Sequence, residues 1–80
     1  MQNNGRLIAT VPKNAADEIR IRLTEFRGHK LCDVRQFTEL DTGKDRTPTK
    51  KGFAVNVKLI PDLIAALQQA ELEARAAHLL

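Results

Sequence analysis

Residues 18–26 alternate between two chemically opposite sides, and this alternation constrains the fold more than any other part of the chain. Successive side chains of an extended strand point to opposite sides, so Ile19, Ile21 and Leu23 share one of them. The other side carries Arg20, Arg22, Thr24 and Phe26. A phenylalanine among arginines is placed to stack on a nucleic-acid base beside a neutralised phosphate. The alternative is that the strand ends or bulges before Phe26, which would return the ring to the apolar side.

One more strand is predicted before this one in the chain, and another is predicted after it. Residues 6–12 form a short strand that Pro12 ends. A basic turn over residues 27–30, in which Gly28 can adopt a positive φ, leads into a strand over residues 31–40. In that strand Cys32 and Val34 share one side, and Asp33, Arg35 and Phe37 share the other.

The second half of the chain combines a loop, a strand and a helix. Residues 41–51 contain Gly and Pro without an apolar anchor and are expected to form a loop. The clearest alternation of the chain predicts a strand over residues 52–59. A helix is expected over residues 60–78, since Pro61 and Asp62 suit its first turn. An apolar stripe follows at helical spacing: Ile60, Leu63, Ile64, Leu67 and Ala70. Four strands followed by one helix predict an α+β fold in a single domain, residues 1–80.

The size of the chain favours a partner. A chain of 80 residues buries only about 60–65% of the surface that it exposes when unfolded, so its own core is thin. A second copy of the same chain is the commonest way to cover what remains.

Several classes of function are disfavoured by what the sequence lacks. It contains no Ser, Tyr or Trp, and its only thiol, Cys32, lies on an apolar side, so neither an intramolecular disulfide nor a nucleophilic enzyme is expected. His29 and His78 have no metal-ligand spacing, and no glycine-rich phosphate loop precedes the helix, so we expect no metal and no cofactor. No apolar run approaches a membrane span of about 20 residues, and residues 1–5 do not resemble a signal peptide, which favours a cytoplasmic protein.

The charge is distributed unevenly. Residues 1–58 hold 12 Lys and Arg against 7 Asp and Glu, a balance of +5, whereas residues 59–80 hold 1 against 3, a balance of −2. A basic sheet with an acidic helix favours an anionic partner on the sheet. The alternative is an ordinary mixed surface exposed to solvent.

The cations and aromatic rings of the basic part form the candidate nucleic-acid-binding set. Its members are Arg20, Arg22, Phe26, Arg27, His29, Lys30, Arg35, Phe37, Lys44, Arg46, Lys50 and Lys51. Core packing is the alternative role for Phe37, and loop solubility is the alternative for Lys44 and Arg46. Single strands suit the set better than duplex DNA, because a groove needs a helix or ribbon and the only helix is net acidic.

Residues 25–37, residues 47–55 and the helix at residues 63–67 together resemble the transcriptional coactivator positive cofactor four family. The shared pattern is an acid–Phe–basic–Gly–basic turn, a hydrophobic–Asp–hydrophobic–Arg strand, a Pro-containing loop and a basic–Lys–Gly entry to the last strand. The resemblance covers about residues 18–70. It implies a curved four-stranded antiparallel sheet with a C-terminal helix, in a homodimer that binds single-stranded DNA or melted duplex.

The resemblance also implies roles for single residues. Phe26 matches the base-stacking Phe of the family, and Arg35 matches its strand arginine. Its basic turn and the basic pair before the last strand correspond to Arg27, His29, Lys50 and Lys51. Departures are Thr38 at a Trp position, Thr24 at an Arg position and Thr47 at a Lys position. Arg20 and Arg22 are expected to compensate for them. The Ser-rich N-terminus of eukaryotic members is missing, which favours a bacterial or phage member.

The function expected from the sequence is therefore binding without catalysis. The expected partners are single-stranded DNA, melted duplex or RNA, a second copy of the chain, and the transcription or replication machinery, in a nucleoid-associated protein. Two alternatives stay open: an RNA-binding or RNA-chaperone module, and an interaction scaffold whose partner docks on the helix and its apolar tail at residues 72–80. A small enzyme is the most remote alternative.

Overall fold

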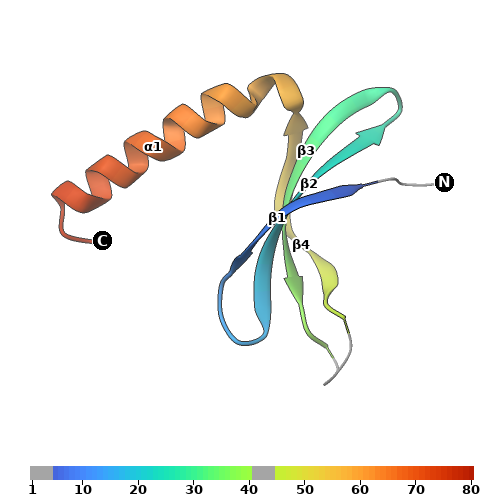
Figure 1. Ribbon diagram of the computed structural model, residues 1–80, viewed down its shortest axis with the longest axis horizontal. Helices are drawn as coiled ribbons and strands as arrows, with labels where there is room; N and C mark the ends of the chain where they lie inside the picture. The colour runs from blue at the N-terminus through green and yellow to red at the C-terminus, as the bar shows by residue number, and fades with distance from the viewer. Residues whose placement is uncertain (1–4, 41–44) are drawn as a thin grey trace.

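The computed structural model describes residues 5–40 and 45–80. Its elements are β1 (Arg6–Pro12), β2 (Asp17–Phe26), β3 (His29–Thr38), β4 (Thr47–Asn56), the 3₁₀ turn η1 (Val57–Leu59) and α1 (Ile60–Ala76). The strands form one sheet in the order β1-β2-β3-β4, and every neighbouring pair is antiparallel. The α+β fold with one C-terminal helix is thus confirmed (Figure 1).

The register between β2 and β3 fixes which side chains share a face. Arg20 lies opposite Arg35 and Arg22 opposite Asp33, whereas Ile21 lies opposite Val34. The pairing runs without a shift to the end of the hairpin, where Phe26 lies opposite His29. The strand therefore neither ends nor bulges before Phe26, and the ring keeps the parity of the arginines, as the alternation predicted.

The largest error of the sequence prediction lies at the start of β4. Residues 47–51 were expected in a loop, but β4 begins at Thr47 and includes Pro48. Proline is tolerated here because β4 is an edge strand, where one N–H needs no partner. The register shifts between Arg35 and Phe37, so that residues 49–51 form a bulge against β3.

Other element ends also move. β2 and β3 begin earlier than expected, and β3 ends at Thr38 rather than at residue 40. The alternation over residues 52–59 does not stay extended, because the Asn56 side chain accepts a hydrogen bond of 2.9 Å from the Lys58 backbone N–H and starts η1. α1 ends at Ala76, two residues early, since the chain turns at His78 with a φ of 61°.

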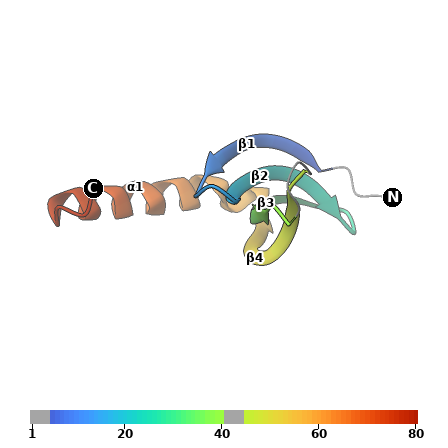
Figure 2. The ribbon, with the colours of Figure 1, turned by 90° about the horizontal axis from the view of Figure 1, so that it is seen from below.

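No described residue forms a second layer on either side of the sheet. Only Cys32, Asp33 and Phe37 are buried among the described residues. α1 packs mainly against η1 and extends away from the sheet as an arm (Figures 1 and 2). Large apolar side chains of the arm and of the neighbouring strand stay exposed, including Phe53, Leu59, Ile64 and Leu67.

Candidate nucleic-acid interface

One face of the central strands carries most of the arginines, and we call it the cationic face. Its residues are Glu18, Arg20 and Arg22 from β2 with Asp33, Arg35 and Phe37 from β3. The Phe37 ring is only 5% exposed. The Cζ atom of Arg20 lies 4.4 Å from its centroid and that of Arg22 lies 5.6 Å away. Two guanidinium groups thus cover this ring, and a base can reach it only if they move.

The arginines of this face are already paired with carboxylates. Arg20 donates to Glu18, which raises the pKa of Arg20 above its ordinary value, and it also reaches Asp45 at 3.2 Å. The backbone N–H of Arg46 and the Arg20 guanidinium together lower the pKa of Asp45. Arg22 and Arg35 share the buried carboxylate of Asp33. Much of the positive charge on the cationic face is therefore balanced within the chain.

Arg46 connects the entry of β4 to the β1–β2 turn. Its Nε atom donates to the Ala16 carbonyl at 3.0 Å, and its Nη2 atom donates to the Ala15 carbonyl at 3.1 Å. A third bond, from Nη1 to Glu18, is 3.1 Å long. These contacts give Arg46 a structural role. The neighbouring candidate Lys44 lies outside the described residues.

The β2–β3 hairpin ends in an exposed aromatic–cation pair. The Phe26 ring is 60% exposed, and the Cζ atom of Arg27 lies 5.1 Å from its centroid. Both central residues of the turn have positive φ, 52° at Arg27 and 82° at Gly28, as the tight two-residue turn of a hairpin requires. His29 and Lys30 follow on the exposed end of β3. Since the Arg27 guanidinium forms no ion pair with the described residues, the open ring and this cation together can accept a base and a phosphate.

The bulge of β4 presents a second exposed basic group. Thr49 holds the bulge, because its hydroxyl donates to the Gln36 carbonyl at 2.9 Å and accepts from the Lys51 N–H at 3.1 Å. Lys50 and Lys51 are exposed and form no ion pair within residues 5–40 and 45–80. A bulge on an edge strand redirects side chains, and two exposed lysines lie at this one.

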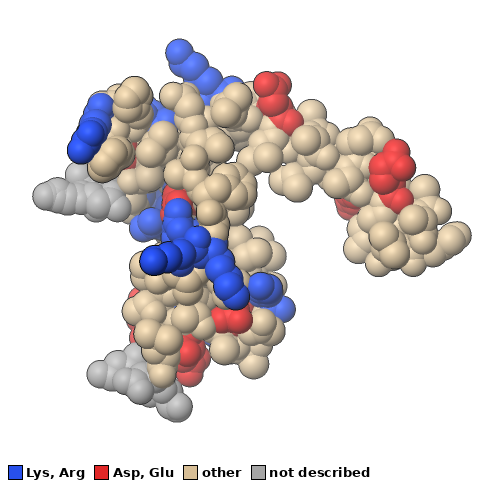
Figure 3. All heavy atoms as spheres, turned by 180° about the vertical axis from the view of Figure 1, so that it is seen from behind, with Lys and Arg blue, Asp and Glu red and all other residues tan. Residues whose placement is uncertain are grey.

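The predicted set therefore divides in two. The inner group is ion-paired or covered and consists of Arg20, Arg22, Arg35, Phe37 and Arg46. The outer group is exposed and consists of Phe26, Arg27, His29, Lys30, Lys50 and Lys51, of which Lys30 pairs with Glu25 at 2.6 Å. On the face shown in Figure 3, basic side chains gather over the sheet with acidic ones among them, and further acidic side chains lie along the arm.

The sequence reasoning missed the acids that hold the inner group. Glu18 and Asp33 have side chains that are 15% and 5% exposed, and each binds two arginines. A signal for both was present, because each acid lies two residues from an arginine in a strand and so must share its face.

Other kinds of site find no support in the described part of the chain. No group of three or more His, Cys, Asp and Glu residues is placed to hold a metal ion within residues 5–40 and 45–80. Burial raises the pKa of the Cys32 thiol, which makes the reactive thiolate scarcer. Among the described residues no helix combines the length and apolar character needed to cross a membrane.

The fold and the site define a class of protein: a single open antiparallel sheet with a cationic face, followed by one C-terminal helix. Residues 13–66 match the family described as Transcriptional Coactivator p15 (PC4). The chain belongs to this family, and the resemblance noted from the sequence is confirmed. A comparison with curated protein sequences found no match.

Solved structures with the same fold come from a bacterium and a phage. A PC4 homologue from Burkholderia pseudomallei is 34% identical with a TM-score of 0.77, over 84% of this chain and 89% of that chain. A second crystal form of that protein gives a TM-score of 0.76. The bacteriophage T5 homologue of PC4, implicated in recombination-dependent DNA replication, is 26% identical with a TM-score of 0.69, over 94% of this chain and 85% of that chain.

Proposed function

We propose that this protein is a homodimer that binds single-stranded DNA with little sequence preference and acts, without catalysis, in transcription, replication, recombination or repair. The observation that carries the proposal is the exposed Phe26 ring with the Arg27 guanidinium beside it. Membership of the PC4 family and the role of the T5 homologue in DNA replication support DNA as the partner. A nucleoid-associated protein is the corresponding expectation.

Binding is divided between the two groups of residues. A base stacks on the open side of Phe26, and Arg27 neutralises the adjoining phosphate. Lys50 and Lys51 supply further positive charge from the bulge of β4. The inner arginines form part of this surface and keep N–H groups that their contacts within the chain do not use, which can donate to the DNA. Stacking and phosphate contacts do not read base edges, so the binding tolerates any sequence.

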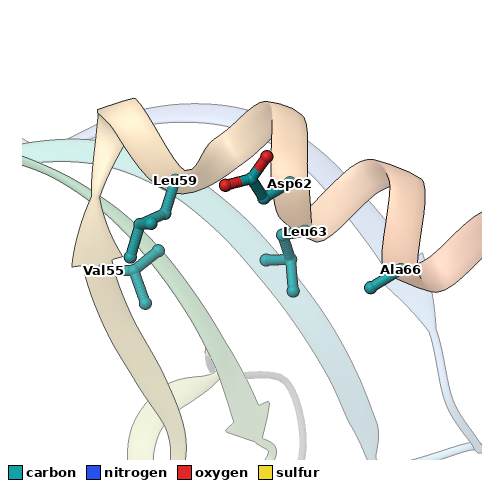
Figure 4. A pocket seen from close by; sticks show the side chains of 5 residues that line it. All are labelled: Val55, Leu59, Asp62, Leu63 and Ala66. Atoms are coloured by element: carbon teal, nitrogen blue, oxygen red, sulfur yellow. The ribbon is translucent and has the colours of Figure 1, made fainter.

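The exposed apolar surface of β4, η1 and α1 is suited to binding a second copy of the chain. Residues from β4, η1 and the first turns of α1 line an open apolar recess with one acid at its rim: Val55, Leu59, Asp62, Leu63 and Ala66 (Figure 4). Ile64 and Leu67 continue the apolar surface along the helix and are 51% and 62% exposed. A chain with so thin a core gains stability by covering this surface.

The salt dependence of binding tests the electrostatic part of the proposal. The affinity for a dT oligonucleotide, measured by fluorescence anisotropy, should fall with a logarithmic slope of about −0.7 per neutralised phosphate, or roughly −3 to −4 for about five contacts. A flat salt dependence would contradict the proposal. Competition between dT and rU strands of equal length measures the preference for DNA over RNA.

Replacing Phe26 tests the stacking part. Phe26→Ala should weaken dT binding by roughly 1–3 kcal/mol, because a stacked base is lost. The midpoint of thermal unfolding should hardly change, since the ring is exposed. Leu40→Ala, which truncates another exposed apolar side chain, serves as the matched control and should leave binding unchanged. Loss of stability with unchanged binding would assign Phe26 to packing instead.

A further inference from the structure

Asp33 is a buried acid on the face that carries the arginines. It lies on the central strand β3, and only 5% of its side chain is exposed. A buried carboxylate opposes the binding of a polyanion in simple charge terms, and an ionised group in this environment persists only where it is fully paired. The position of this carboxylate therefore has to be explained by the side chains that it binds.

The carboxylate holds two guanidinium groups from neighbouring strands. Its Oδ2 atom accepts a hydrogen bond of 3.1 Å from Nη2 of Arg22, on β2. Its Oδ1 atom accepts bonds of 3.2 Å from Nε and 3.0 Å from Nη2 of Arg35. Nη1 of Arg35 donates to the Thr49 carbonyl of β4 at 3.0 Å. One acid thus fixes the orientation of two arginines, and one of these arginines is also tied to β4.

Both guanidinium groups keep donors that these contacts do not use. A guanidinium has five N–H groups, and the described contacts of Arg35 use one each on Nε, Nη1 and Nη2. The described contacts of Arg22 use one N–H, on Nη2, which leaves the other Nη N–H groups as donors. Its Nε has no hydrogen-bond partner in the described part of the chain, but this atom is buried and does not face a ligand. Two guanidiniums and one carboxylate carry a net charge of +1. The trio has the donors and the charge to bind one more anionic group.

We propose that Asp33 is a positioning residue for nucleic-acid binding. It holds Arg22 and Arg35 side by side so that the unused N–H groups on their Nη atoms donate hydrogen bonds to the oxygens of one backbone phosphate. This inference rests on the proposed function, and it gives the inner arginines a defined role in it. Fixed guanidinium groups lose less conformational freedom on binding than free side chains do, which outweighs the opposing charge of the acid.

The variant Asp33→Asn separates positioning from charge. It makes the cationic face more positive by one unit, so a charge account predicts tighter binding to a dT oligonucleotide. Positioning predicts the opposite, a loss of about tenfold at constant salt, because an amide holds the two guanidiniums less firmly. Glu73→Gln is the matched control, since it changes the charge equally on the exposed arm and should leave the affinity within about twofold. Binding by Asp33→Asn that equals or exceeds that of the wild type overturns the inference.

A second variant decides the matter if Asp33→Asn does not fold. Arg35→Lys keeps the charge but cannot reach both Asp33 and the Thr49 carbonyl, so it should also weaken binding about tenfold. If both variants fold, their losses should not add in the double variant, because they disrupt one arrangement. Full affinity of Arg35→Lys, or additive losses, overturns the inference. Wild-type protein that does not bind dT overturns the proposed function itself, which distinguishes the two failures.

Discussion

Arg27 differs from the other arginines of the sheet in both its backbone and its partners. It has a φ of 52°, a region in which a non-glycine residue is uncommon, and its guanidinium lies over the exposed Phe26 ring without an ion pair to any residue that the structure describes. The arginines over Phe37 lie in ordinary strand geometry and pair with Glu18 and Asp33, whose side chains are 15% and 5% exposed. Strain that packing does not require points to a functional reason for arginine at this position.

Replacing Arg27 by asparagine should therefore separate stability from binding. Asparagine is favoured at this position of a tight hairpin turn, so Arg27→Asn should raise the free energy of unfolding by about 0.5 kcal/mol. The same change should weaken dT binding and make the salt slope shallower by about 0.7. Thermal unfolding and anisotropy titrations measure the two effects. Unchanged affinity would remove Arg27 from the interface.

Thr38, which was expected from the sequence to replace a Trp of the family, forms a hydrogen bond within the fold. Its hydroxyl donates to the Asp17 carboxylate, and this bond, followed by one from Asn14, lowers the pKa of Asp17 below its ordinary value of 3.8. A lowered pKa in the folded state adds stability above the unfolded pKa, and that stability is lost as the pH falls through the folded pKa.

Thr38→Val should accordingly be less stable than the wild type at pH 7, and the difference should shrink below about pH 3.8. Urea unfolding at pH 7 and at low pH measures it. Thr10→Val is the matched control, because Thr10 on β1 makes no side-chain hydrogen bond in the described part, and its effect should not vary with pH. A pH-independent difference for Thr38→Val would contradict the coupling to Asp17.

Local alternation predicted which residues share a face, but it could not predict how they pair. The side of the strand on which Phe26 lies followed from the even number of positions that separates it from Arg22 in the sequence. The burial of Phe37 under Arg20 and Arg22 depends on the register of β2 against β3, a contact between residues that are far apart in the sequence. Arg20 and Arg22 were expected to compensate for Thr24 and Thr38 in binding. Both guanidinium groups already lie over Phe37 and pair with acids, so either must change its contacts before it can bind DNA.

At the scale of elements, β4 owes its shape to one glycine beside its bulge. Gly52 has a φ of 152° and lies opposite Arg35. A Cβ atom here would come within 2.4 Å of the Val34 carbonyl oxygen and 2.6 Å of the Arg35 Cα. The sequence showed glycine, proline and polar residues before an alternating run, which are typical of a loop. Strand pairing to β3 prevails because the Thr49 side chain binds the Gln36 carbonyl.

Gly52→Ala should destabilise the protein by roughly 2–4 kcal/mol, because backbone atoms of β3 cannot yield to the added methyl group. The midpoint of thermal unfolding should fall by about 10 °C or more. Gly28→Ala is the matched control: it also has a positive φ, 82°, but no atom lies within 4 Å of the added Cβ. Its cost should be only about 1–2 kcal/mol of backbone strain. Equal shifts for both variants would contradict the close approach at Gly52.

At the scale of the whole molecule, the chain exposes two surfaces of different character. The sheet is basic, with a balance of +5 over residues 1–58, and the arm is acidic and apolar, with a balance of −2 over residues 59–80. The sequence predicted this division, because net charge needs no tertiary information. It could not predict that α1 leaves its own sheet uncovered, since an apolar stripe is equally compatible with packing on the same chain and on another.

Two leucines of α1 test whether a second copy covers the stripe. Leu67 and Leu72 are 62% and 63% exposed, but five residues place them about 140° apart around the helix. Leu67 continues the apolar recess, whereas Leu72 lies away from it. Light scattering should give the wild type twice the mass of one chain, and Leu67→Lys should shift it to a single chain, because the charge would be buried in the interface. Leu72→Lys should remain dimeric.

The unfolding midpoint of the wild type should rise with protein concentration, as it does for a dimer. A wild type with the mass of one chain at micromolar concentration, or an equal response of the two variants, would contradict this account of the arm.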